Sequence, residues 1–176
     1  MKSLLIILSL ALIIQFSSCD LFKKSDPKPL TELQKLPPAT QTGKNTFGCL
    51  INGKAFVPIS TTDITAIYQQ GILQIGVHTT SPYQSVGLSV DETNYGPITT
   101  ISYPLNKPPN SSGGSSYMPL NGSSLCSTQA ISGVITITKI DRVSYIVSGT
   151  FEFSSAASGC DTLKITNGRF DIKYIP

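Results

Sequence analysis

From residue 47 onward the chain consists of short runs in which apolar and polar residues alternate, separated by Gly, Pro, Asn and Ser. Side chains point to opposite faces at successive positions of a β-strand, so such runs indicate strands with one buried face. No stretch after residue 46 keeps helical periodicity over three turns, so helices should be scarce. The expected strands of the first half are 47–51, 54–57, 64–68, 72–78, 85–90 and 98–103.

The C-terminal third allows strand pairing to be predicted. Strands 131–139 and 143–153 can close around residues 140–142, which places Ile135 opposite Val147. A slip by one residue would exchange the two faces, so the alternation specifies the register. In 163–172, a two-residue turn at Asn167-Gly168 predicts a hairpin. One long strand with a bulge at Gly168 is the alternative.

Eight to ten short antiparallel strands with tight connections predict a β-sandwich, with a small closed barrel as the alternative. Residues 106–124 depart from this pattern because they are dense in Pro, Asn, Gly and Ser. We expect this segment to form a long exposed loop at one end of the sheets.

The N-terminus has the features of an export signal. A basic start is followed by an apolar run over 4–14, which as a helix would reach about 16 Å, roughly half the hydrocarbon thickness of a bilayer. The run ends in Phe16-Ser17-Ser18-Cys19, which resembles the bacterial lipobox, where small residues precede a cysteine that is acylated. The resemblance implies a signal peptide over 1–18 and a membrane anchor of acyl chains on Cys19. An ordinary secretory signal is the alternative.

Residues 19–46 contain four prolines and five lysines. Proline fixes φ and lacks an N–H, so this composition predicts a disordered tether in which 31–36 could form one helical turn. Its lysines could contact anionic head groups, or it could be a linker without contacts. The folded domain is then expected at 47–176.

Charge argues against nucleic-acid binding. The net charge of +3 comes from the leader and the tether, because the part from residue 47 onward has seven Lys/Arg and seven Asp/Glu. Nucleic-acid binding requires clustered cations that displace counterions, and a neutral domain lacks them.

With Cys19 lipidated, three cysteines remain for an oxidising compartment. The predicted register brings Cys126 and Cys160 to the same end of the 131–153 hairpin, which favours a disulfide between them. Cys49 lies inside an apolar strand pattern and would remain a buried free thiol.

Few residues suggest catalysis. The single histidine, His78, shares a strand face with Gln74 and Gly76, away from the apolar face, so a surface position is expected. No metal-ligand spacing or phosphate-binding loop is present, and we expect no enzymatic activity, metal or cofactor. The remaining candidates are aromatic: tyrosines suit glycan or protein recognition because they offer a flat apolar face and a hydroxyl. The possible binding surface is Tyr83, Tyr95, Tyr103 and Tyr117.

Two segments carry a resemblance to a known family. One is 46–58, TFGCLINGKAFVP, and the other joins IVSGTFEF at 146–153 to GCDTLKITNGRFDIKY at 159–174. Together with the lipobox they resemble a family of small outer-membrane lipoproteins of unknown function from Gram-negative bacteria. The resemblance implies a cell-envelope location and no established activity.

These observations lead to three hypotheses about function. The first is a membrane-tethered, non-enzymatic β-sandwich that binds a glycan or an envelope protein through residues 79–124. The second is a barrel that carries a small apolar ligand. The third is a hydrolase with His78 as base, which requires a carboxylate near that histidine.

Overall fold

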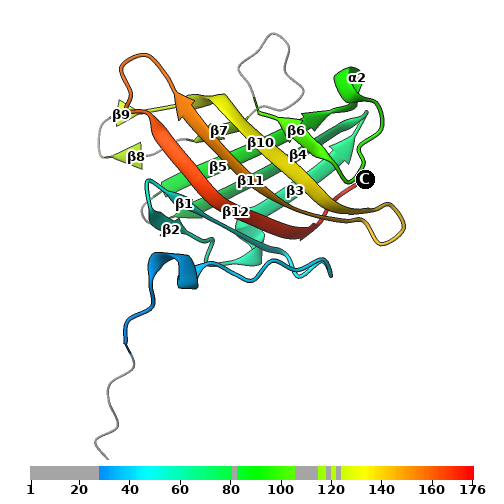
Figure 1. The fold of residues 1–176 in the computed structure, drawn as a ribbon, viewed down its shortest axis with the longest axis horizontal. Coiled ribbons are helices and arrows are strands. Elements are labelled where there is room, and N and C mark those ends of the chain that lie inside the picture. Colours follow the sequence, from blue (N-terminus) through cyan, green and yellow to red (C-terminus); the bar gives the residue numbers. More distant parts are fainter. Residues whose placement is uncertain (1–27, 81–82, 106–114, 118–119, 122–123) are drawn as a thin grey trace, which may run out of the picture.

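The structure is a computed structural model that describes residues 28–80, 83–105, 115–117, 120–121 and 124–176. The described chain is an antiparallel β-sandwich with three isolated helical turns (Figure 1). The turns are η2 (Glu32–Lys35), η3 (Thr61–Asp63) and α2 (Glu92–Tyr95). The strands are β1 (Thr46–Ile51), β2 (Lys54–Phe56), β3 (Ile64–Gln69), β4 (Ile72–Thr80), β5 (Tyr83–Asp91), β6 (Ser102–Pro104), β7 (Ser115–Tyr117), β8 (Leu120–Asn121), β9 (Ser124–Leu125), β10 (Thr128–Asp141), β11 (Ile146–Ala156) and β12 (Leu163–Lys173).

The strands form two layers. The first contains β2, β1, β12, β11, β10 and β6, and the second contains β5, β4 and β3. Strand β7 pairs with both β10 and β5 and so connects the layers. In the described chain the path ends at β2 and β3, which do not pair with each other. A single bridge between Ile67 and Ile175 joins β3 to the residues after β12. The path therefore stays open, as expected for a sandwich rather than a closed barrel.

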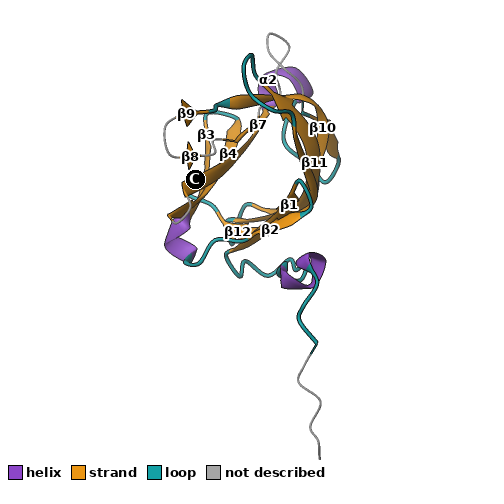
Figure 2. Cartoon of the chain, turned by 90° about the vertical axis from the view of Figure 1, so that its left-hand side faces the viewer, coloured by secondary structure: helices purple, strands orange, loops and turns teal. Residues whose placement is uncertain are grey.

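Apolar side chains fill the space between the layers, whose strands lie on opposite sides of the core in Figure 2. Phe151 stands at the centre of one half, with its ring 5.1 Å from that of Phe47 and 6.3 Å from those of Phe153 and Phe170. The second layer contributes alternating inward residues, as in Leu73, Ile75 and Val77 of β4, each at most 2 % exposed. This alternation is the one that predicted the strands.

Asn52 and Gly53 form the turn of the first hairpin, between the predicted strands 47–51 and 54–57. Both residues have positive φ, 48° and 81°, as a type I′ turn requires, and Ile51 pairs with Lys54. Strands β3, β4 and β5 also match the predicted segments and extend them. The prediction for 98–103 was wrong over most of its length, because β6 begins only at Ser102.

The predicted register of the β10–β11 hairpin was wrong by four residues. Ile135 lies opposite Phe151, not Val147. The turn is later because the Asp141 carboxylate accepts hydrogen bonds from the backbone N–H groups of Val143 and Ser144. Because side chains alternate between the two faces of a strand, a shift by four residues leaves most inward-facing residues inward. Bulges in β10 interrupt this alternation and leave Ile131 half exposed.

The hairpin predicted at Asn167-Gly168 was also wrong. Residues 163–173 form one strand, β12, which pairs with β1 on one side and β11 on the other. Asn167 has φ 54°, and both pairings shift register beside it, so the alternative of a bulge is what the structure contains. The long loop predicted at 106–124 requires correction as well, because it contains the connecting strand β7; residues 106–114, 118–119 and 122–123 lie outside the described chain.

The largest departure concerns the predicted disordered tether. Residues 31–45 lie on the first layer, and we call them the strap. Thr31 caps η2 as expected for a helical turn there, and the Glu32 carboxylate accepts from the backbone N–H of Ala55 in β2 at 2.7 Å. Leu36 is buried near Gly48 of β1. The described part of the tether is therefore docked on the domain.

Candidate functional site

One carboxylate, that of Asp171 in β12, fixes the strap. Five groups donate to it: the hydroxyls of Thr40 and Ser148, at 2.6 and 2.8 Å, and three successive backbone N–H groups at 2.7–3.2 Å. The three backbone donors are Thr42, Gly43 and Lys44. Burial by itself would raise the pKa of Asp171, which is 1 % exposed, but these hydrogen bonds outweigh it and hold the pKa well below its usual range.

Other contacts carry the strap across further strands. The Gln41 amide donates to the backbone carbonyl of Thr138 in β10, and the Lys139 ammonium donates to the Gln41 carbonyl at 3.0 Å. At the end of the strap, the Asn45 side chain accepts from the backbone N–H of Lys173. The strap thus crosses the outer face of the first layer and then enters β1.

The strap borders a groove of about 410 Å³ on this outer face. Its floor is formed by outward residues of β10, β11 and β12, among them Thr136, Thr150, Glu152 and Arg169, and Ala39 of the strap lies at its edge. The strand registers explain the arrangement, because Thr150 lies opposite both Thr136 and Arg169. A smaller hollow of about 190 Å³, lined by Lys164 and others, shares Glu152 with the groove.

The groove holds charged groups that the protein leaves available. Within the described chain, the Glu152 carboxylate has no hydrogen-bond or ion-pair partner. The Arg169 guanidinium also lacks a carboxylate partner there, and it makes only long hydrogen bonds, at 3.4 Å, to the backbone carbonyls of Asn167 and Pro37. The groove therefore offers a carboxylate that can accept hydrogen bonds, a guanidinium that can donate them, and neighbouring hydroxyls.

A second polar cluster closes one end of the sandwich. The Tyr68 hydroxyl donates to Glu92, and Arg142 lies 3.7 Å from the same carboxylate and donates to the Ile98 carbonyl at 3.0 Å. The Tyr68 ring also packs against Tyr174, 5.7 Å between centroids. Desolvation and the bond to Glu92 raise the pKa of Tyr68. These groups satisfy one another, so this cluster joins β3, α2 and the β10–β11 turn.

The predicted tyrosine surface does not form. Tyr103 is fully buried, with its hydroxyl bonded to the backbone of Thr99, and the Tyr95 ring packs against it at 5.5 Å. Tyr83 begins β5, whereas Tyr95 follows the other end of that strand. The side chain of Tyr117 lies outside the described part. Tyr103 cannot belong to a binding surface, because position 103 of β6 faces the core.

His78 lies at the surface, as predicted. Its side chain is 42 % exposed and stacks on Tyr83, on the face opposite Leu73, Ile75 and Val77. Asp63 lies 3.8 Å away, too far for a hydrogen bond, and its carboxylate caps η3 through the backbone N–H of Ser60.

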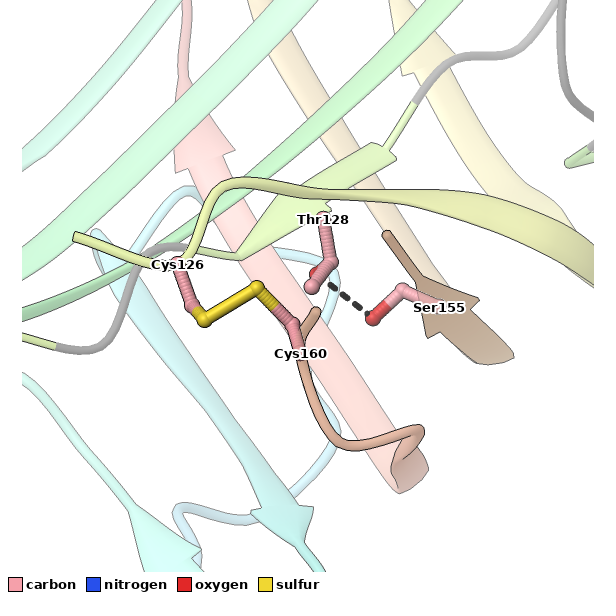
Figure 3. Close-up of a disulfide and its surroundings, with 4 residues drawn as sticks. All are labelled: Cys126, Thr128, Ser155 and Cys160. Atoms are coloured by element: carbon pink, nitrogen blue, oxygen red, sulfur yellow. Dashed lines mark hydrogen bonds between the residues drawn. A yellow bond between two sulfur atoms is a disulfide. The ribbon is translucent and has the colours of Figure 1, made fainter. Parts of the chain in front are cut away.

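The predicted disulfide between Cys126 and Cys160 is confirmed, although the register from which it was inferred was wrong by four residues. Cys126 and Cys160 are bonded, with Cα atoms 6.0 Å apart (Figure 3). Beside the bond, the Thr128 hydroxyl donates to the hydroxyl of Ser155 at 2.9 Å. Cys49 is a free, fully buried thiol, and burial raises its pKa far above the usual range, so it is a poor nucleophile.

Residues 46–172, from the start of β1 almost to the end of β12, match the profile of a family described as a domain of unknown function, DUF6252. The chain belongs to this family. No curated protein and no solved structure matches it. The DUF6252 match includes the floor of the groove and Asp171, but it begins after the strap that Asp171 holds.

Two structural observations on this DUF6252 protein concern metals and membranes. The described residues contain no group of three or more His, Cys, Asp or Glu side chains that could hold a metal ion. In the same residues, no helix has the length and apolar character needed to cross a membrane. Cys19, the residue predicted to be acylated, lies outside the described chain.

Proposed function

We propose that this protein is an exported, lipid-anchored binding protein of the cell envelope, at the outer membrane, without enzymatic activity, and that its groove takes a glycan. The observation that carries the proposal is the pair of charged groups, Glu152 and Arg169, left without ionic partners on a hydroxyl-rich floor. Glu152 is exposed and Arg169 is half-buried, so both charged groups face the groove and are accessible to a ligand there.

The chemistry of the floor favours a sugar. Sugar hydroxyls both donate and accept hydrogen bonds. The groove offers the Glu152 carboxylate as an acceptor, the Arg169 guanidinium as a donor and the Thr150 hydroxyl as either, while the Thr136 hydroxyl already shares a hydrogen bond with Ser102 at 2.8 Å. The groove is open and wide enough for a few sugar rings rather than for a deeply enclosed molecule. An apolar ligand is less suited, because the space between the layers is already filled by core side chains.

The proposed anchor places this groove at a membrane. The lipobox-like sequence before Cys19 supports acylation there, and the apolar run at 4–14 supports export. Mass spectrometry of the N-terminal peptide from envelope fractions tests the anchor directly: a diacylated Cys19 is expected. A mature N-terminus without fatty acid would contradict it.

Glycan binding is tested with soluble chain 20–176 on a glycan array, followed by titration of any ligand found. We expect Glu152→Gln, which keeps the shape of the side chain, to weaken binding about tenfold or more, because it removes a charged acceptor. Lys173→Gln, at the far end of β12, is the matched control and should bind as the wild type does. Failure to bind any glycan, or equal binding by Glu152→Gln, would overturn the proposal.

A further inference from the structure

The corner formed by η2 and the β1–β2 hairpin has an exposed apolar component. Leu30, which directly precedes the N-cap residue Thr31, is 61 % exposed. Leu33, which lies within η2, is 49 % exposed. Ile59, which follows β2, is 84 % exposed and shares a small hollow with Pro37 of the strap. Leu30 and Leu33 lie only three residues apart, and exposed apolar side chains that lie together mark interaction sites more often than single ones do.

The same corner is basic. Lys28, Lys35 and Lys54 are exposed, and the nearby carboxylate is that of Glu32, so the corner carries three positive charges and one negative charge, a net +2. Glu32 is also engaged, since it accepts from Ala55 N–H and from Lys35. The corner therefore combines excess positive charge with exposed leucines.

Chain length places this corner close to the proposed anchor. Only nine peptide units separate Cys19 from Lys28, which limits their distance to about 32 Å even when fully extended. Because the strap is bonded to the domain from Glu32 onward, the domain cannot move further away by releasing more chain. The opposite end of β12, at Lys173, lies about 30 Å further along the strand than Lys164.

Resting on the proposed lipid anchor, we infer that this corner docks on an anionic lipid surface. The lysines lie against the head groups and the two leucines enter the interface, in the manner of short basic and apolar segments that bind membranes peripherally. Docking would fix which side of the domain faces the bilayer. The groove, on the outer face of β10, β11 and β12, would then be held at a defined orientation to the membrane.

The test recreates the anchor chemically, so it does not depend on acylation in the cell. Mature chain 19–176 is coupled through the Cys19 thiol to a maleimide lipid; Cys49 is buried and Cys126 and Cys160 are bonded to each other, so none of them competes. The protein is placed on vesicles of phosphatidylcholine, or of an equimolar mixture with phosphatidylglycerol. Lysine acetylation rates are then read residue by residue by mass spectrometry.

On the anionic vesicles we expect acetylation of Lys28, Lys35 and Lys54 to slow about fivefold relative to the neutral ones. Lys139 and Lys173, at the other end of the sandwich, are the internal controls and should react equally on both. Leu30→Ser with Leu33→Ser should remove most of the protection. Equal rates at the corner on both vesicle types, or equal slowing at the controls, would overturn the docking surface. Neither result bears on acylation of Cys19, which the N-terminal mass measures separately.

Discussion

At the scale of single residues, Asp171 has the largest consequence. Its carboxylate accepts hydrogen bonds from five donors in the strap and β11. Removing it would leave the buried Ser148 hydroxyl and four partly buried strap donors without an acceptor. We expect Asp171→Ala to lower the free energy of unfolding by about 3 kcal/mol or more in urea titrations. Asp161→Ala, an exposed carboxylate without such bonds, is the matched control and should be neutral. Equal stabilities would show that the carboxylate does not hold the strap.

Glycines at two positions let aromatic rings lie over neighbouring strands. A Cβ on Gly149 would come within 2.3 Å of the Thr136 carbonyl and 2.7 Å of the Phe170 ring, and one on Gly168 within 2.5 Å of the Phe151 ring. The strand pairing explains the symmetry, because Gly149 lies opposite Phe170 and Gly168 lies opposite Phe151. Both glycines belong to the two C-terminal motifs found in the sequence.

These contacts predict the effects of single methyl groups. Gly149→Ala and Gly168→Ala should each destabilise the domain by about 1–3 kcal/mol, because the rings or the backbone must move. Gly76→Ala provides the comparison: it also lies within a strand, but nothing approaches the added Cβ within 4 Å. Thermal unfolding of the three variants measures the difference, and a Gly149→Ala protein as stable as Gly76→Ala would contradict the packing.

At the scale of elements, identical local signals had different outcomes. Asn52-Gly53 and Asn167-Gly168 both favour a tight turn, but only the first forms one. Strand β12 has partners on both sides, β1 and β11, so its Asn-Gly becomes a bulge within a continuous strand. The β10–β11 register was missed because the bulges in β10 and the hydrogen bonds of Asp141, which move the turn, leave no local signal in the sequence.

The disulfide joins two segments that lie between strands. It joins the residues before β10 to the turn between β11 and β12, over a sequence separation of 34 residues. Loop-closure entropy predicts that Cys126→Ser with Cys160→Ser lowers the free energy of unfolding by about 3 kcal/mol. The same loss should appear when the wild-type protein is unfolded in reductant, and no change in either experiment would argue against the bond.

At the scale of the whole molecule, the free energy of unfolding should decrease at low pH, because Asp171 becomes protonated there. Its pKa in the folded state lies below its unfolded value, so its contribution is complete above about pH 4 and is lost as the pH falls further. We expect the unfolding free energy of the wild type to fall more steeply below that pH than that of Asp171→Asn. Parallel pH profiles for the two proteins would contradict the assignment.

Sequence predicted the class of fold and the inward faces, because alternation depends on local residues. It did not predict the groove, since Thr136, Glu152 and Arg169 come together only through the pairing of three strands. It also misjudged the strap: proline and lysine content suggested disorder, while the acceptor for Thr42 lies 129 residues away in Asp171. Local composition gives no signal for such a contact.

The docked strap borders the groove and also holds η2 at the corner proposed to face the membrane, so both proposals depend on its docking. Hydrogen–deuterium exchange of chain 20–176 tests it at residues 40–44. We expect slow exchange of the Thr42, Gly43 and Lys44 amides, comparable with that of β1. In Asp171→Ala we expect these amides to exchange fast even where the rest of the domain remains protected. Exchange of these amides in the wild-type protein at the rate of an unstructured peptide would contradict it.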